Sequence, residues 1–192
     1  MNKIILASSS PYRKELLSRL GLDFTCHSPD IDETVHLEEA PDDYVLRMSS
    51  EKAAKIAEIH EKSLIIASDQ ASICEQSILG KPGNHVNAIK QLQYISGKQV
   101  VFSTAVTLLD TEKNQATSWI DHFTVVFRTL EITEIERYLL ADKPYDCAGS
   151  FKSEKLGVAL CDSMRGDDPT ALIGLPLISL AKHLREFGYS IP

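Results

Sequence analysis

The sequence lacks the long apolar segment of a membrane protein and the cysteine spacing of a metal site or disulfide framework. No apolar run approaches the ~18 residues that a membrane span needs. The first apolar stretch is too short for a signal peptide, so we expect a cytoplasmic protein. The four cysteines lie far apart without a CxxC pair. This spacing favours reduced, buried or half-buried thiols over zinc ligands or disulfides.

Several signatures of catalysis and nucleotide binding are also missing. The chain has no GxxxxGK[ST] P-loop, no GxGxxG, no GxSxG and no cysteine–histidine signature. Its six histidines are scattered without HExxH spacing, so we expect them at the surface or its boundary. Acidic residues outnumber basic ones by 27 to 20, a net charge of −7. This balance argues against nucleic-acid and membrane partners, but it allows a local basic pocket for an anionic ligand.

The composition is that of a soluble protein with a substantial core. Apolar residues make up 43% of the 192 residues and charged residues 24%, which excludes disorder, collagen and coiled coil. No repeat or linker divides the chain. We therefore expect one domain over residues 1–192, which could have two lobes.

Apolar periodicity predicts an α/β fold with a mixed central sheet flanked by helices and a small antiparallel lobe. Serine, asparagine and proline at the expected helix starts, and glycine just beyond several ends, place the boundaries. The expected strands are 3–7, 64–67, 99–109 and 117–127, and the expected helices are 11–20, 41–60, 84–95, 131–141 and 177–187.

The serine-rich segment after the first strand predicts an anion site. Ser10 is a good helix N-cap, Pro11 suits the first turn, and Gly21 lies where a helix would end. A strand, a serine loop and a helix N-terminus in direct succession point free backbone N–H groups at a negative ligand. A simple helix cap is the alternative, and both can hold.

Lys52 stands out on the helix expected over 41–60. With Val45 set at zero on a wheel of about 100° per residue, Lys52 falls near −20°, inside the stripe of Met48, Ile56 and Ile59. Such a lysine can snorkel past the core to water. It can also point inward to a phosphate, and the wheel does not choose between the two.

Cations and carboxylates near the expected strand ends suggest water attack on a phosphoanhydride. Cations clamp phosphates, and carboxylates hold a divalent metal. Asp69 follows a short buried strand, where open α/β sheets place ligands. Each residue alone is more often a surface charge. The set comprises Arg13, Lys52, Lys81, Lys152, Asp32, Glu33, Asp69 and Glu154.

Six blocks in order resemble the Maf family of nucleoside triphosphate pyrophosphatases over nearly the whole chain. The resemblance implies an α/β fold with a cleft between two lobes, similar to inosine-triphosphate pyrophosphatases. It also implies hydrolysis of a nucleoside triphosphate to a monophosphate and diphosphate with a divalent cation, Mg²⁺ or Mn²⁺, and is compatible with a homodimer. The blocks are Ser8-Ser9-Ser10-Pro11-Tyr12-Arg13, Asp32-Glu33-Thr34, Glu51-Lys52-Ala53, Ser68-Asp69-Gln70, Gly80-Lys81-Pro82 and Ala148-Gly149-Ser150-Phe151.

The resemblance also implies a role for individual residues. Asp69 would accept the proton of the attacking water, with the metal nearby, and Glu33 would bind the metal or orient the water. A carboxylate beside a metal stays ionised, as a base has to be. Arg13, Lys52 and Lys81 are implied to hold the triphosphate, assisted by Ser8, Ser10 and the amides of the first helix turn. Lys52 and Lys81 count among the catalytic residues, and Lys152 is a further substrate-binding candidate.

Three positions resemble the branch that acts on 7-methyl-GTP: Tyr12, Gln70 and Glu154. Methylated guanine is cationic, so the ring of Tyr12 or Phe151 would add a cation–π contact of roughly 0.5–2 kcal/mol. Glu154 would accept from the N1–H and the amine of the base. One residue departs from that branch, because Lys155 stands where glycine usually follows the glutamate.

Two other functions stay open. One is a pyrophosphatase for dTTP, UTP or other modified nucleotides, whose family members carry threonine after the catalytic aspartate. Gln70 and Glu154 argue against it. The other is a non-catalytic nucleotide-binding regulator of cell division. The joint presence of Asp69, Glu33, Lys52 and Lys81 argues against that function.

Overall fold

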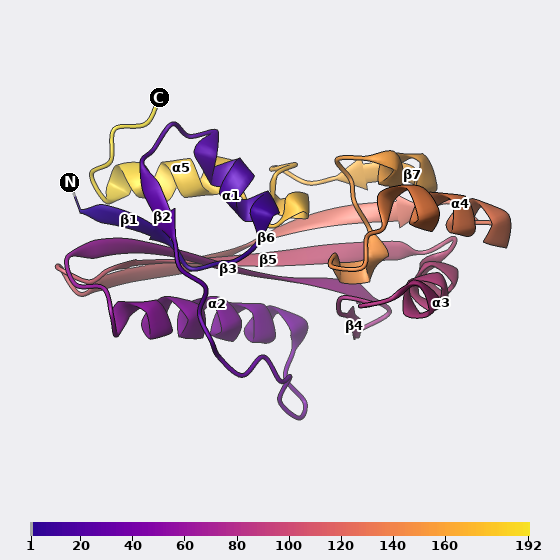
Figure 1. Cartoon of the computed structure of the whole chain (residues 1–192), viewed down its shortest axis with the longest axis horizontal. Helices are drawn as coiled ribbons and strands as arrows, with labels where there is room; N and C mark the ends of the chain where they lie inside the picture. Colours follow the sequence, from indigo (N-terminus) through magenta and orange to yellow (C-terminus); the bar gives the residue numbers. More distant parts are fainter. Residues whose placement is uncertain (1) are drawn as a thin grey trace. The chain divides into compact units, whose positions relative to one another are not determined.

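The computed structural model describes residues 2–192, whose contacts divide into two compact units (Figure 1). The first unit comprises the chain up to Asp69, Thr104–Asp121 and Asp168–Pro192. The second comprises Gln70–Ser103 and His122–Asp167. The assignment of residues 1–192 to a single domain stays a prediction.

The described chain contains both helices and strands, and its sheet has parallel and antiparallel pairs, which confirms the prediction of a mixed α/β fold. Hydrogen bonds join seven strands within residues 2–192 in the order β2-β1-β3-β5-β6-β7, with β4 paired to β3. The strands are β1 Lys3–Leu6, β2 Phe24–Cys26, β3 Ser63–Cys74, β4 Ser77–Leu79, β5 Gln99–Asp110, β6 Gln115–Phe127 and β7 Cys161–Arg165. The α-helices are α1 Pro11–Ser18, α2 Pro41–Ala57, α3 His85–Ile95, α4 Ile132–Asp142 and α5 Leu177–Glu186, and the 3₁₀ turns are η1 Ala148–Ser150, η2 Leu156–Leu160 and η3 Ala171–Ile173.

The first unit is a three-layer sandwich of helices around a sheet. β1 runs parallel to both β2 and β3, and its last pair with β3 joins Leu6 to Ile66. Helices α1 and α5 cover one face of these strands, and α2 covers the other (Figure 1). β1 and the first half of β3 are therefore buried on both faces, which explains their uninterrupted apolar runs.

Alternate residues of β1 and β3 face different helices, because successive side chains of a strand point to opposite faces. Even-numbered residues pack with α1 and α5, and odd-numbered residues pack with α2. Burial of each large side chain contributes roughly 1.5–3 kcal/mol. The first cluster includes Ile4, Leu6, Leu64, Ile66, Leu16 and Leu180, and the second includes Ile5, Ala7, Ile65, Ala67, Ala53 and Ile56.

The second unit combines antiparallel strands with α3 and α4. The end of β3 pairs antiparallel with β4, and the end of β6 pairs antiparallel with β7. Its core contains the ring of Phe151, whose centroid lies 5.9 Å from that of Phe102 and 5.1 Å from that of Phe127. The expected antiparallel lobe is confirmed in this unit.

Most predicted elements are confirmed. Ser10 and Asn84 cap the first and third helices through their side chains. β5 and β6 are hydrogen-bonded neighbours joined by a short turn, as the hairpin prediction requires. The histidines, all among the described residues, are exposed or half-buried as expected.

Other element predictions are wrong. The strand expected over 64–67 continues to Cys74, because β5 is also its hydrogen-bonded neighbour and β4 pairs with its last three residues, Ser72–Cys74. The second helix ends at Ala57, so Ile59 leaves the apolar stripe and is 59% exposed. Cys26 is exposed rather than buried, since β2 is a short strand at the edge of the sheet. The sequence pattern did not predict β2, β4 or β7.

No helix in the described part of the chain has the length and apolar content needed to cross a bilayer.

Candidate active site

The backbone of β3 places Asp69 just beyond the parallel part of the sheet. Pairing with β1 ends at Ile66, and the strand continues past that point. Alternation puts Asp69 on the face of Ile65 and Ala67, which is the face covered by α2. Asp69 therefore lies where α2 can reach it, at the edge that the sequence predicted for ligand binding.

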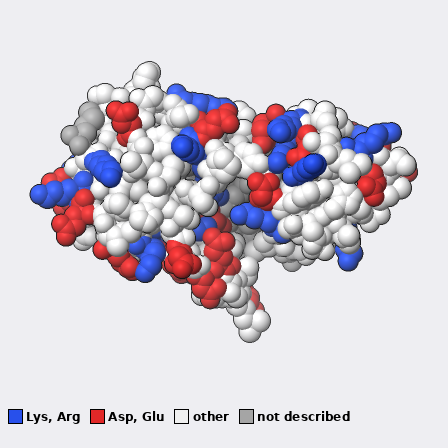
Figure 2. Space-filling model, viewed as in Figure 1, with Lys and Arg blue, Asp and Glu red and all other residues white. Residues whose placement is uncertain are grey.

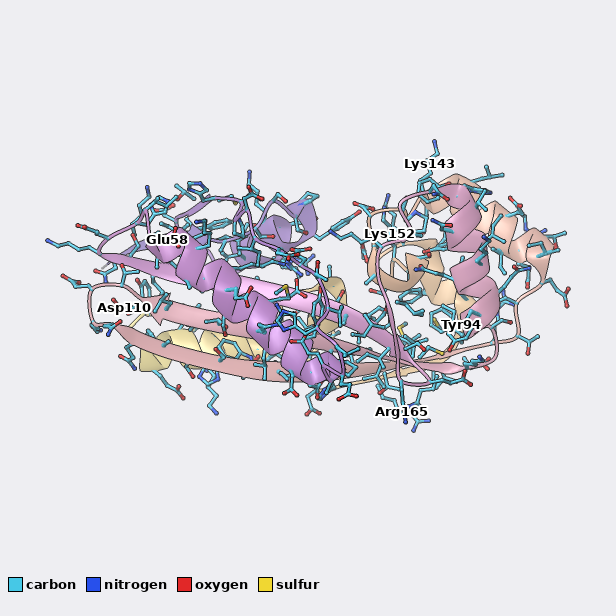
Figure 3. The ribbon with its side chains drawn as sticks, turned by 90° about the horizontal axis from the view of Figure 1, so that it is seen from below. Glu58, Tyr94, Asp110, Lys143, Lys152 and Arg165 are labelled. Carbon is cyan, nitrogen blue, oxygen red and sulfur yellow. The ribbon has the colours of Figure 1, made fainter. Side chains whose placement is uncertain are left out.

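Lys52 comes from α2 and points inward. Its residue is only 6% exposed, and its Nζ lies 2.5 Å from Oδ1 of Asp69 and 2.7 Å from Oε1 of Glu33. Figure 3 views the first unit from the side of α2, with Glu58 labelled just beyond the helix. Of the two interpretations left open by the helical wheel, the structure supports the inward one.

Glu33 reaches the same ammonium group from a long irregular segment between β2 and α2. Its side chain is 55% exposed. The hydroxyl of Tyr44, in the first turns of α2, donates to the carbonyl oxygen of Glu33 at 3.2 Å. The Oδ1 atom of Asp32 accepts from the backbone N–H and the hydroxyl of Thr34, which forms a tight turn around Glu33. Two carboxylates and one lysine thus meet in the first unit.

Arg13 adds a second cation to this part of the first unit. Its Nε donates to the carbonyl oxygen of Gly174 at 3.0 Å, and the hydroxyl of Ser68 donates to the same oxygen at 2.9 Å. Burial lowers the pKa of Arg13, and the negative charges of Asp69 and Glu33 oppose that change. Arginine remains protonated in proteins, so the site keeps this positive charge.

The serine loop before α1 is an ordered helix cap. Ser10 Oγ accepts from the backbone N–H of Arg13 at 3.4 Å, and the N–H of Ser10 donates to Ser8 Oγ at 3.1 Å. Tyr12 lies half-buried in the first turn of the helix. The capping interpretation is therefore confirmed, and phosphate binding by Ser8 and Ser10 stays a prediction.

The remaining predicted site residues belong to the second unit and have different partners there. Lys81 is exposed and Gln70 is half-buried. Lys152, labelled in Figure 3, is 7% exposed; its Nζ donates to the carbonyl oxygen of Asp142 at 3.3 Å and lies 3.7 Å from Oδ1 of Asp146. The roles of Lys81, Gln70 and Lys152 stay predictions.

In the segment 151–155 the structure contradicts one prediction, and it shows that Lys155 fits where glycine usually stands. Phe151 is 5% exposed and packs within the aromatic core of the second unit, so it is wrong as a stacking partner for the base. Glu154 is exposed and accepts from Ser153 Oγ at 3.5 Å. Lys155 has a φ of −133°, so its backbone does not need the left-handed conformation that favours glycine.

Comparison with known proteins identifies the family. A family profile described as "Maf-like protein" matches residues 3–187. The chain belongs to the Maf family.

Relatives of this Maf chain match it over nearly full length. The protein from Alcanivorax borkumensis is 47% identical over 98% of this chain and 96% of its own length. Those from Pseudomonas syringae pv. syringae and Pseudomonas savastanoi pv. phaseolicola are 48% and 49% identical over 100% of both chains. All three are named 7-methyl-GTP pyrophosphatase. A HAM1 protein from Coxiella burnetii aligns with 83% of this chain and 98% of its own, at 15% identity and a TM-score of 0.44.

Three residues around the Maf carboxylates were not predicted as part of the site. Gly174 is distant in sequence from the residues it contacts, and no pattern in the sequence marks its carbonyl oxygen as their acceptor. Tyr44 and Arg47 lie on the same helix as Lys52, and both contact the segment that carries Glu33. The sequence shows that this helix carries a tyrosine and an arginine near Lys52. It does not show that the segment with Glu33 passes next to them, so their roles could not be predicted.

The carboxylates of this Maf chain fit a divalent cation that is shared with a substrate. Mg²⁺ is usually bound through one or two carboxylates together with phosphate oxygens and water. Asp69 and Glu33 converge on one ammonium group, so their oxygens already face one positive charge. Among residues 2–192, no group of three or more metal-ligating side chains is present.

Charged side chains on the face shown in Figure 2 are interspersed, with lysines and arginines next to aspartates and glutamates. This face offers no broad basic area for a nucleic acid backbone.

The environment of Tyr44 makes a prediction for alkaline pH. Burial, reinforced by the charges of Asp69 and Glu33, raises the pKa of Tyr44 to about 12. The folded state therefore retains a proton that the unfolded chain releases at about pH 10. Tyr44 contributes stability below that pH, and the contribution is lost as the pH rises towards 12.

We expect the ultraviolet phenolate titration of Tyr44→Phe, subtracted from that of the parent, to show one group that ionises near pH 12. A rapid pH jump keeps the measurement ahead of unfolding. A difference curve with its midpoint near pH 10 would contradict the assigned environment.

Proposed function

We propose that this chain hydrolyses 7-methyl-GTP to 7-methyl-GMP and diphosphate. The meeting of Lys52 with the carboxylates of Asp69 and Glu33, at the end of the parallel strands, carries the proposal. It is supported by relatives of that name at 47–49% identity over nearly the full chain. Two cations beside two carboxylates suit a phosphoanhydride and the water that attacks it.

In the proposed reaction, the oxygen of a water molecule bonds to a phosphorus of the α–β anhydride. The bond from that phosphorus to the bridging oxygen breaks, and diphosphate is released. Asp69 accepts the proton of the water on Oδ2, since Oδ1 contacts Lys52. Lys52 and Arg13 stabilise the negative charge that develops on the phosphate oxygens.

Other Maf-family residues have supporting roles in the proposal. Ser8, Ser10 and the first amides of α1 bind phosphate oxygens, as do Lys81 and Lys152. Asp69 and Glu33 would hold the divalent cation, Mg²⁺ or Mn²⁺, which when bound neutralises phosphate charge.

Recognition of the base is assigned to three side chains. Glu154 is exposed and can accept two hydrogen bonds from the Watson–Crick edge of guanine. Tyr12 is the remaining aromatic candidate for a contact with the cationic ring. Gln70 stands where the pyrimidine-specific members of the family carry threonine.

Diphosphate release from a panel of nucleotides tests the proposal. The panel is 7-methyl-GTP, GTP, dTTP, UTP and CTP, each with Mg²⁺ and with Mn²⁺. We expect 7-methyl-GTP to have the highest kcat/KM. A preference for dTTP or UTP would retain the chemistry and overturn the base assignment. Tight binding without turnover of any nucleotide would favour a regulator.

Glu154→Gln tests the base assignment directly. Both bases offer the same N1–H and amine, but only 7-methylguanine carries a positive charge, which a carboxylate attracts more strongly than a neutral amide does. A hydrogen bond to a charged group exceeds a neutral one by about 1 kcal/mol, so we expect discrimination between 7-methyl-GTP and GTP to fall about 5-fold. The ratio of the two kcat/KM values measures it. Asp162→Asn, an exposed carboxylate of the same unit, is the control and should leave the ratio unchanged. Equal losses on both nucleotides would show that Glu154 does not read the charge of the methylated base, and unchanged kcat/KM values for both would remove it from base recognition.

We further propose that the protein acts in the cytoplasm. Its four cysteines, all among the described residues, form no disulfide with one another, which suits a reducing compartment. The homodimer suggested by the family resemblance stays a prediction that sedimentation equilibrium checks.

A further inference from the structure

We propose that Arg47 is a positioning residue, which holds the loop that carries Glu33 so that this carboxylate meets Lys52. The inference rests on the proposed function, because it assigns Arg47 a role through a predicted catalytic group. Nothing in the family comparison assigns a role to this arginine.

The loop needs such a support, because it has no regular structure of its own. Residues 27–40 form neither helix nor strand, apart from a turn at 37–38. Glu33 is more than half exposed, so burial does not hold its side chain in place. Leu37, further along the loop, is 95% exposed, so the loop has no apolar anchor at this point. Polar contacts must therefore fix its path.

Arg47 supplies such contacts at both ends of the segment 34–39. Its Nε and Nη2 bind Oε1 and Oε2 of Glu39 at 2.6 and 2.7 Å, a two-pronged arrangement that fixes orientation as well as distance. Nη2 also donates to the carbonyl oxygen of Thr34 at 3.0 Å. Thr34 directly follows Glu33, so the arginine restrains the backbone next to the carboxylate.

Glu39 extends the restraint to a second position of the loop, His36. Its Oε2 also accepts from the backbone N–H of His36 at 3.0 Å. The hydrogen bonds from Arg47 hold the pKa of Glu39 at about 2, so the pair stays ionised at any ordinary assay pH. The Arg47 side chain is 19% exposed and that of Glu39 only 9%, which protects the pair from water and salt better than a surface ion pair.

The helix α2 carries both halves of the arrangement. Arg47 and Lys52 lie five residues apart on it, and Tyr44, one turn earlier, donates to the carbonyl oxygen of Glu33. Because the helix is rigid, fixing the loop to Arg47 also fixes the distance between Glu33 and Lys52. Arginine suits this position because its planar guanidinium binds both oxygens of Glu39 with two N–H groups and still reaches the carbonyl oxygen of Thr34. An ammonium group lacks this fixed two-pronged geometry.

A double-mutant cycle tests whether Arg47 acts through Glu33. We expect Arg47→Met to lower kcat for 7-methyl-GTP about 10-fold or more, with a smaller change in KM, because small misplacements of catalytic groups are costly. In a Glu33→Gln background the same change should lower kcat less than about 2-fold. Arg47→Lys should recover only part of the loss. Arg19→Met removes the exposed pair with Glu15 in the same unit and should match the parent.

Equal losses from Arg47→Met in both backgrounds would overturn the proposal, and so would an unchanged kcat in the parent background. Hydrogen exchange gives a second readout that needs no turnover. The amide of His36 should exchange about 10-fold faster in Arg47→Met than in the parent or Arg19→Met. If no nucleotide is hydrolysed but this amide is deprotected, the proposed function fails and the loop restraint stands. Unchanged exchange at His36 would overturn the restraint itself.

Discussion

Asp69→Asn should lower the turnover of 7-methyl-GTP by roughly 10²–10⁴-fold, the contribution expected of a general base. The carboxamide has nearly the same shape and can still accept from Lys52 through Oδ1, so the fold and nucleotide binding should persist. Diphosphate release under saturating substrate measures the loss, and calorimetric binding of the nucleotide checks that the site is intact.

Asp110→Asn is the matched control for this variant. Asp110 is a buried aspartate of the same unit, 3% exposed, whose Oδ1 accepts from Asn2 and from the N–H groups of Glu112 and Lys113. Asp110 is the last residue of β5, and none of these hydrogen bonds involves a predicted site residue. The turnover of Asp110→Asn should therefore match that of the parent. Retention of more than about a tenth of the turnover by Asp69→Asn would remove Asp69 from the role of base.

Lys52→Met should lower the free energy of unfolding by about 3 kcal/mol and also reduce turnover strongly. Removing one partner of a buried ion pair leaves the other charge uncompensated, and Asp69 is only 8% exposed. The expected loss lies at the lower end of the usual range, because Glu33 is more than half exposed and can turn to water. Urea denaturation measures the loss of stability, and diphosphate release measures turnover.

Two further variants make this expectation specific. Lys55→Met removes an exposed lysine of the same helix that pairs with Glu58, and should change stability by less than about 0.5 kcal/mol. Lys52→Met combined with Asp69→Asn should recover part of the stability, since the asparagine is neutral. The assigned ion pair would be contradicted if Lys52→Met were as stable as Lys55→Met.

Local chemistry explains why many of the elements could be predicted. A serine or asparagine cap needs only the next three residues. Ser10 caps its helix as expected, and Asn84 caps the helix that was predicted to begin there. β1 and the first half of β3 could also be predicted, because helices cover both faces of each and their apolar runs are therefore continuous. The six ordered blocks were enough to indicate the family, which the profile match over 3–187 confirms.

Boundaries that depend on a distant partner could not be predicted in this way. The polar second half of β3 resembles a loop in the sequence, and only the neighbouring strands β5 and β4 make it a strand. Phe151 resembled an available stacking ring, and only the contacts with Phe102 and Phe127 show it to be part of a core. In each case the structure of the residue depends on a neighbour that is distant in sequence. Folding brings that neighbour close, and the adjacent residues do not indicate it.

The chemical groups of the site can be read from the amino-acid sequence, whereas their meeting depends on how the chain folds. The position of Lys52 within an apolar stripe followed from helical periodicity. Its inward direction followed only from the carboxylates of Asp69 and Glu33, which arrive from a strand and an irregular loop. A charged side chain leaves water only where opposite charges replace its hydration, and those charges come together only when the chain has folded.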